Sequence, residues 1–143
     1  TMSGSEEKAM SERIDVENVA PWGASMRYSR AVRIGPLIEV SGTTAVDEEG
    51  NVVAVGDVAG QVRQCFSIVE RALRDVGGSL GDVIRTRLFV VDMSTWGSAG
   101  AAHDEVFAGL PAPASSAVGI AALLHPDLLV EVEVTAYIAD RTS

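Results

Sequence analysis

Three side chains of this sequence could take part in acid–base chemistry or hold a small polar ligand. The carboxylate of Glu131 could accept a proton or orient a water molecule if its surroundings raise its pKa, and the alternative is a structural ion pair with an arginine. Tyr28 could donate a hydrogen bond to a ligand or stack on it, and the alternative is an interfacial aromatic ring with a hydrated hydroxyl. His103 could titrate near neutral pH, whereas a lone histidine on a weak helix is more often a packing or surface residue.

Hydroxyl and guanidinium groups supply further candidates. Ser115 and Ser116 could hydrogen-bond a polar ligand, but there is no G-x-S-x-G elbow with arranged His and Asp partners, so serine catalysis is not expected. Arg27, Arg30 and Arg87 could bind an anion, and Arg27 could reach a cleft from its mouth because it precedes the tyrosine. The alternative for each arginine is a surface charge.

Metals and cofactors have little support in the residue pattern. Two histidines and one cysteine do not form a convincing set of metal ligands. No P-loop or dinucleotide-binding fingerprint is present, so neither a metal nor a cofactor is expected. Cys65 lies within a helical pattern and is interpreted as a buried apolar thiol, and His125, in a turn before Pro126, is expected to be solvated.

The overall charge and the apolar runs argue against two classes of partner. A net charge of −9 repels phosphate backbones, so no nucleic-acid partner is expected. No apolar run reaches the roughly 18 residues that span a bilayer, so no membrane partner is expected either. Because the N-terminus also lacks a secretory signal pattern, the expected location is cytoplasmic.

The length of 143 residues suits one domain. Residues 1–18 are polar and mixed in charge, and they are expected to form a flexible arm outside the fold. Thr1 precedes Met2 and is interpreted as a cloning remnant. Residues 19–143 are then expected to form a single domain.

The helices that must position the candidate residues follow from three- and four-residue spacing. Asp57 is the expected N-cap of the first helix, Gln61 and Gln64 fall mainly outside its apolar stripe, and Gly77-Gly78 ends it. A weaker helix is predicted over residues 97–108, where two glycines lower the propensity. The apolar stripe of the first helix consists of Val58, Val62, Cys65, Phe66, Val69, Leu73 and Val76.

Strands are predicted on both sides of these helices. Their ranges are 31–34, 37–44, 84–93, 115–123 and 128–139, with a short extended piece at 52–55. The order β-β-α-β-α-β-β predicts an α+β fold in which the helices pack on one face of a mixed sheet.

The faces of two strands indicate a partner. In the last strand, Leu128 and every second residue after it form an apolar face, while Glu131 and Glu133 lie on the other. In the strand at 84–93, Ile84, Thr86, Leu88 and Val90 share one face, and Arg85, Arg87, Phe89, Val91 and Met93 share the other. We interpret the second face as buried between subunits, with Arg85 or Arg87 near one of the glutamates; the alternative is a solvated face with scattered apolar residues.

An ordered set of segments resembles the RidA (YjgF-type, endoribonuclease L-PSP) superfamily. The resemblance runs from about Tyr28 to Ala139, and no single motif decides it. The segments are Tyr28-Ser29-Arg30-Ala31-Val32, Gly35, Val40-Ser41-Gly42, Gln61-Val62-Arg63-Gln64, the strand from Val83 to Met93, and Val130-Glu131-Val132-Glu133.

The resemblance implies a chorismate-mutase-like fold, a homotrimer and ligand clefts between subunits. Typical members hydrolyse 2-imino acids to 2-keto acids and ammonia, and an arginine after Pro-Ala grips the substrate carboxylate. Here Ser115 stands at that position, Gly100 stands where typical members have an asparagine, and His103 stands where they often have an aromatic residue. The resemblance further implies that Tyr28, Ser41 and Gly42 line the pocket and that Glu131 positions the attacking water; Phe89 of the central strand is a further expected ligand contact.

Two functional hypotheses follow. The first is an enzyme or degenerate enzyme that binds a small imine, enamine or keto-acid-like metabolite in three clefts, with weak or absent activity on 2-imino acids because Ser115 replaces the arginine. The alternative is a non-catalytic regulatory trimer that binds a metabolite or a protein. RNA cleavage, once proposed for the superfamily, is disfavoured by the acidic charge and the lack of a basic–aromatic patch.

Overall fold

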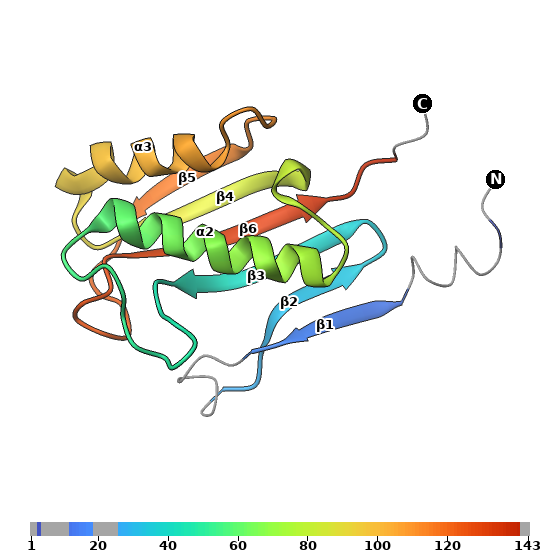
Figure 1. The fold of residues 1–143 in the computed structure, drawn as a ribbon, viewed down its shortest axis with the longest axis horizontal. Coiled ribbons are helices and arrows are strands. Elements are labelled where there is room, and N and C mark those ends of the chain that lie inside the picture. The colour runs from blue at the N-terminus through green and yellow to red at the C-terminus, as the bar shows by residue number, and fades with distance from the viewer. Residues whose placement is uncertain (1–2, 4–11, 19–25, 141–143) are drawn as a thin grey trace.

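A six-stranded sheet with two α-helices on one face forms the fold of the computed structural model, which describes residues 3, 12–18 and 26–140 (Figure 1). The strands lie in the order β1-β2-β3-β6-β4-β5. Short 3-10 helices at Leu80–Asp82 and Met93–Thr95 lead into β4 and α3. The main elements are β1 (Arg13–Glu17), β2 (Ser29–Ile34), β3 (Leu37–Thr44), α2 (Val58–Asp75), β4 (Val83–Val90), α3 (Trp96–Val106), β5 (Ala114–Gly119) and β6 (Val130–Tyr137).

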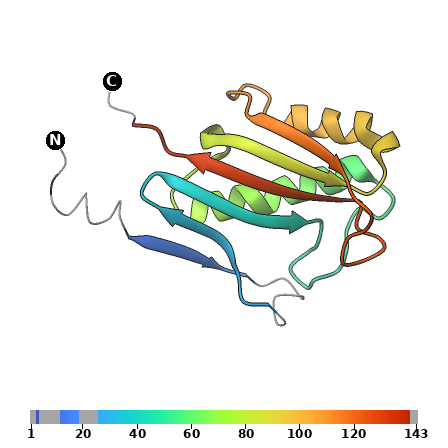
Figure 2. The same cartoon turned by 180° about the vertical axis from the view of Figure 1, so that it is seen from behind.

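The predicted α+β class and the order of elements from β2 to β6 are confirmed. The sheet is mixed because β5 pairs with β4 in parallel, while all other neighbouring strands pair antiparallel. Seen from behind, both helices lie on the far side of the sheet, and no described element of the chain covers the near face (Figure 2). We call this uncovered side the open face, and the side under α2 and α3 the helix face.

Part of the predicted flexible arm is an ordered strand. Residues 13–17 form β1, which pairs antiparallel with β2 from Arg13↔Ile34 to Glu17↔Ser29. The prediction of an arm was therefore wrong for this segment, because Val16 packs against the core although charged residues dominate the composition. Residues 1, 2 and 4–11 of the predicted arm lie outside the described residues.

Helix α2 begins and ends where the capping residues predict. The Asp57 side chain accepts a hydrogen bond from the Gly60 N–H at 3.0 Å, and Gly77 adopts φ +87°, which favours glycine. The placement of Gln61 outside the apolar stripe was wrong, since its side chain is fully buried. Its amide accepts from Leu129 N–H at 2.8 Å and donates to the Asp127 carbonyl at 2.9 Å, which ties the turn before β6 to the helix.

The two faces of β6 are arranged as its alternation predicts. Leu128 and the residues at 130, 132, 134 and 136 are buried under the helices. In β4 the prediction failed at one position, because an irregularity between Val83 and Arg85 places Val83 in the core and leaves Ile84 50% exposed. From Arg85 onward the predicted alternation holds, with Thr86, Leu88 and Val90 fully buried.

The predicted pairing of charges on the open face is confirmed in one of its forms. Arg87 lies opposite Glu133 in the β4–β6 ladder, and their side chains approach to 3.9 Å. Arg85 instead donates a hydrogen bond to Ser116 Oγ at 2.7 Å. Both members of the Arg87–Glu133 pair remain about 40% exposed, so the pair sets register more than it adds stability.

The remaining elements differ from the sequence prediction mainly in their ends. Strand β5 ends at Gly119, four residues before the predicted end at position 123. The short piece around Val52 forms only an isolated bridge with Val46.

Candidate functional site

Glu131 lies next to Gly42 at the point where β3 and β6 pair irregularly. The β3–β6 register shifts between Val40 and Thr43, and Gly42 stands inside this irregularity. A Cβ added at Gly42 would lie 2.7 Å from Glu131 Oε1 and 2.9 Å from its Cδ. The glutamate carboxylate therefore occupies the space that any side chain at position 42 would take, and the need for glycine here is one of close approach.

Tyr28 and Ser41 are connected to the neighbourhood of Gly42 through β2. Arg30 donates a hydrogen bond from Nη2 to the Gly42 carbonyl at 2.6 Å, and its guanidinium carbon is 6.0 Å from the centroid of the Tyr28 ring. Ser41 Oγ donates to the Ser29 carbonyl at 2.6 Å, so its hydroxyl fastens β3 to β2. Arg30 thus contacts Gly42 and approaches the Tyr28 ring, while Ser41 precedes Gly42 in β3 and Glu131 packs against Gly42. We call these five residues the glutamate cluster.

Electrostatics in the glutamate cluster favour a carboxyl group that keeps its proton up to a higher pH than an ordinary glutamate does. Burial raises the pKa of Glu131, the nearby Glu133 raises it further, and Arg30 opposes both effects. Phe89 lies directly opposite Glu131 in the β4–β6 ladder and supplies an apolar neighbour. A carboxylate with a raised pKa is suited to take a proton from water, which is the role that acid–base chemistry requires.

Among the three candidate arginines, only Arg30 is brought to the glutamate cluster. Arg27 is exposed, and Arg87 is paired with Glu133. Burial lowers the pKa of Arg30, but a guanidinium stays charged at any physiological pH. Its Nε is buried with no hydrogen-bond partner within residues 3, 12–18 and 26–140, so one donor of this cation is unused.

Three other candidate residues lie elsewhere. Ser115 pairs with Thr86 in the parallel β4–β5 ladder, and the Thr86 hydroxyl donates to Ser115 Oγ at 2.8 Å. Thr86 also lies 2.9 Å from Nε2 of His103. Because Thr86 points to the helix face, Ser115 and His103 lie on the side of the sheet opposite to Glu131 within one chain. Ser116, one residue on, holds Arg85 instead.

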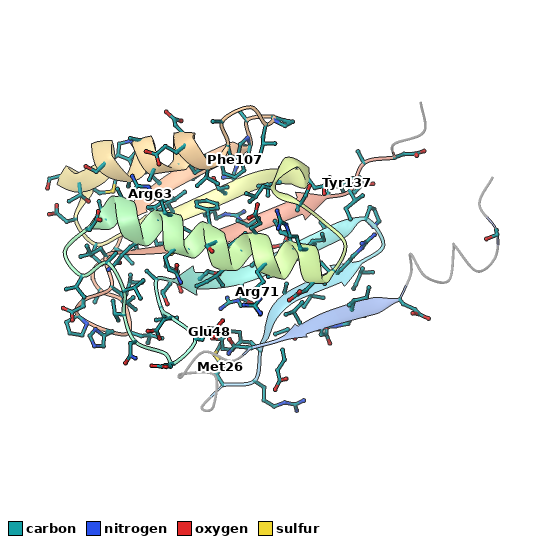
Figure 3. All side chains as sticks on the ribbon, in the orientation of Figure 1. Met26, Glu48, Arg63, Arg71, Phe107 and Tyr137 are labelled. Atoms are coloured by element: carbon teal, nitrogen blue, oxygen red, sulfur yellow. The ribbon has the colours of Figure 1, made fainter. Side chains whose placement is uncertain are left out.

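His103 is packed rather than free on the surface. Its ring lies 5.6 Å from the Phe66 ring and 4.8 Å from the Phe107 ring, centroid to centroid. Figure 3 places Phe107 at the end of α3. Burial lowers the pKa of His103, while the charge of Asp104 raises it in part. The ring is thus favoured in its neutral form near pH 7.

A surface cavity of about 660 Å³ lies between α2, the end of β1 and the loop after β3, and it overlaps the glutamate cluster only at Arg30. Arg71 of α2 and Glu48 of that loop, both labelled in Figure 3, line the cavity, and their side chains pair at 3.4 Å. Glu131 does not line this cavity, so the cavity and the candidate carboxylate are separate features of the structure.

Metal coordination and membrane insertion have no support in the described part of the chain. No three histidine, cysteine or carboxylate side chains gather into a metal site in residues 3, 12–18 and 26–140. Neither helix in that part of the chain is long and apolar enough to cross a bilayer. Cys65 is buried, and burial raises the pKa of its thiol, as expected for a core residue.

Some features of the site could not be read from the pattern of the sequence. The sequence raises Arg30 as one of three arginines but does not favour it, and nothing singles out Thr86. A threonine within a β-branched run is predicted to be an ordinary core residue. The groups that its hydroxyl contacts lie in α3 and β5, which are distant in sequence.

Solved structures share this arrangement of sheet and helices. A member of the YjgF/YER057c/UK114 family from Mycobacterium tuberculosis is similar with a TM-score of 0.79 and 40% identity, over 89% of this chain and 100% of that chain. The YjgF gene product of E. coli is similar with a TM-score of 0.76 and 33% identity, over 89% of this chain and 98% of that chain. The architecture is therefore the chorismate-mutase-like fold of YjgF-type proteins.

Sequence comparison places the chain in the same class. The family described as Endoribonuclease L-PSP matches residues 18–138. The 3-aminoacrylate deaminase RutC of Acinetobacter baylyi is 32% identical over 111 residues, which are 78% of this chain and 86% of that protein. A RutC family protein of Pyrococcus abyssi is 30% identical over 110 residues, covering 77% and 85%. The chain belongs to the Endoribonuclease L-PSP family, within the RidA superfamily.

Proposed function

We propose that this protein is a homotrimer that binds a small imine, enamine or keto-acid-like metabolite in clefts between subunits, and that it hydrolyses the carbon–nitrogen bond of the imine or of the enamine in its imine form. The observation that carries the proposal is the half-buried Glu131 carboxylate against Gly42, with its pKa raised by burial and by Glu133. A relative that is 32% identical is a 3-aminoacrylate deaminase, and its substrate belongs to the same chemical class.

The proposed reaction assigns one proton to Glu131. The oxygen of a water molecule adds to the carbon of the C=N bond while Glu131 accepts a proton from that water. Glu131 then passes this proton to the nitrogen, which takes a second proton from the new hydroxyl group and leaves as ammonia, so that a carbonyl group forms on the carbon and Glu131 is regenerated. Tyr28 and the backbone at Ser41 and Gly42 hold the ligand, and the positive charge of Arg30 lowers the pKa of Glu131 and so favours its ionised form.

An RNA substrate does not fit this site. The family's description names an endoribonuclease. However, the chain carries a net charge of −9, and a polyanion would bind only against this charge. The proposal is therefore limited to small molecules.

Activity on 2-imino acids is expected to be weak, because Ser115 cannot form the two parallel hydrogen bonds of a guanidinium with a carboxylate. A pyridoxal-phosphate oxidase that generates 2-iminopropanoate provides the assay, with clearance measured as ammonia and pyruvate. Ser115→Arg should raise clearance by about tenfold or more, since a charge-assisted bidentate pair is among the strongest polar contacts.

Ser115→Gln is the matched control, because it adds length without charge and should leave clearance low. Rapid clearance by the wild type at catalytic protein levels, or an equal gain from Ser115→Gln, would show that the missing cation is no handicap.

The open face is proposed to be the subunit interface. Phe89 stands there beside the Arg87–Glu133 pair, and no described element of the chain covers it. In sedimentation equilibrium we expect a mass about three times the 15.0 kDa of the chain. Phe89→Asp should shift the mass toward one subunit, whereas Val55→Asp, at an exposed loop residue, should not. A wild-type monomer would contradict the shared-cleft proposal.

A further inference from the structure

A continuous chain of hydrogen-bonding groups connects α3, β4 and β5 on the helix face. His103 Nε2 lies 2.9 Å from Thr86 Oγ1, and Thr86 Oγ1 lies 2.8 Å from Ser115 Oγ. The middle member is fully buried, whereas Ser115 is exposed at the edge strand of the sheet. The chain therefore runs from a packed imidazole to a hydroxyl that a ligand can reach.

The fold fixes each member of this chain. Thr86 and Ser115 are register partners in the parallel β4–β5 ladder, so their side chains point to the same side. The His103 ring is held edge-on by Phe66 of α2 and is stacked at a tilt of 39° on Phe107. A side chain packed in this way loses little further freedom when it hydrogen-bonds, which favours a pre-organised chain.

The direction of the donors decides what Ser115 offers. A Thr86 hydroxyl that donates to Ser115 has no proton left for His103, so it accepts from His103, whose Nε2 then carries the hydrogen. Ser115 already accepts from Thr86, and its own O–H remains to donate outward. Hydrogen bonds aligned in one direction polarise one another, so this outer O–H is a better donor than an isolated serine.

The chain as a whole is uncharged near neutral pH. Burial lowers the pKa of His103, and Asp104 on the same helix is the charged group that counters this effect. From the elements packed against the ring, α2 contributes Phe66 and β4 contributes Thr86, while Arg63 of α2 is paired with Glu105 at 3.0 Å. The Ser115 hydroxyl is therefore a neutral donor of one hydrogen bond, whereas the arginine of typical family members is a charged donor of two.

We propose that His103, Thr86 and Ser115 form one polarised hydrogen-bond chain that makes Ser115 the donor to an uncharged carbonyl oxygen of the ligand, at the position where typical family members grip a carboxylate. The ligand class is therefore a small amide or ketone whose acceptor oxygen carries no full charge. A carboxylate would lose the charge-assisted contact that an arginine supplies, whereas a neutral carbonyl needs only one good donor. This proposal rests on the proposed function only for where the ligand binds, and it does not require that the ligand is hydrolysed.

Nuclear magnetic resonance on the full-length, ¹⁵N-labelled protein tests the direction of the chain. The sequence has two histidines, so His125→Gln leaves His103 as the only imidazole signal. We expect the hydrogen on Nε2 and not on Nδ1 at pH 7. Thr86→Val should shift the Nε2 resonance, and Thr86→Ser, which restores a hydroxyl, should return it. A hydrogen on Nδ1 would reverse the chain and overturn the proposal.

Titration with two small probes, pyruvamide and pyruvate, tests the ligand class. Pyruvamide should bind the wild type more tightly than pyruvate does, and Ser115→Ala and Thr86→Val should each weaken pyruvamide binding about five- to tenfold. Thr86→Ser should bind within about twofold of wild type, as should Ser98→Ala, an exposed control on α3. Ser115 is exposed, so Ser115→Ala keeps the test valid even if Thr86→Val does not fold.

The outcomes separate this proposal from the deaminase proposal. Tighter binding of pyruvate, no binding of pyruvamide, or unchanged affinity in Ser115→Ala would each overturn the ligand class. Absence of any hydrolytic activity, with pyruvamide bound through Ser115, would instead leave this proposal standing and remove only the proposed catalysis.

Discussion

Glu131→Gln is expected to reduce turnover of an enamine or imine substrate by about 100-fold or more, because the amide cannot accept a proton from the attacking water. The measurement is steady-state ammonia release from 3-aminoacrylate, with ligand affinity followed separately. A regulatory protein without catalysis would behave differently. Neither the wild type nor Glu131→Gln would release product, and the substitution would change only the affinity for the ligand.

The pH dependence of the wild type provides a second readout for Glu131. Its pKa is raised mainly by burial, so the working carboxylate forms only as the pH rises through a value above that of an ordinary glutamate. Turnover should therefore increase with pH over this range. A carboxyl whose pKa is higher when folded contributes stability at low pH and loses that contribution as the pH rises through the folded pKa. Glu131→Gln should thus gain stability relative to wild type at neutral pH and not at acid pH.

Gly42→Ala tests the same carboxylate without changing it. The new Cβ would meet Glu131 Oε1 at 2.7 Å, so the carboxylate must move, and turnover should fall while the helices and sheet persist. Gly97→Ala is the matched control, because a Cβ there would meet nothing within 4 Å. Full activity in Gly42→Ala would mean that the position of this carboxylate does not matter to the reaction.

Gln61→Ala is expected to cost about 3 kcal/mol of unfolding free energy, since it leaves the Leu129 N–H and the Asp127 carbonyl without their partner in a buried place. Urea unfolding at a fixed protein concentration measures the loss, because association also adds stability. Gln64→Ala is the control; it removes one bond to the Val46 carbonyl, at 2.8 Å, and should cost about 1 kcal/mol. Equal losses in the two variants would contradict a special role for Gln61.

Local patterns were sufficient for the fold. The eight-residue alternation of β6 and the three- and four-residue spacing of α2 each reflect one dominant environment, a core on one side. Patterns failed where a polar residue is buried by a distant partner, as with Gln61, or where the backbone is irregular, as at Ile84. Neither condition leaves a trace in the spacing of apolar residues.

The candidate site could be predicted only in part, for a related reason. The resemblance to a family indicated Tyr28, Gly42 and Glu131, and the structure places these three together. It could not indicate that Arg30 opposes the rise in the pKa of Glu131, nor that Thr86 links His103 to Ser115. Such links depend on which strands and helices become neighbours, and a single sequence does not record the register between them.

The separation of Glu131 and Ser115 by the thickness of one sheet has a consequence for energetic coupling. Within a single chain, a layer of backbone stands between the two side chains, and residues without shared partners contribute independently to binding. In an isolated subunit, a double-mutant cycle on these two positions should therefore give an interaction energy of zero. Any measurable interaction energy in the assembled protein would have to pass between the glutamate of one copy and the serine of another.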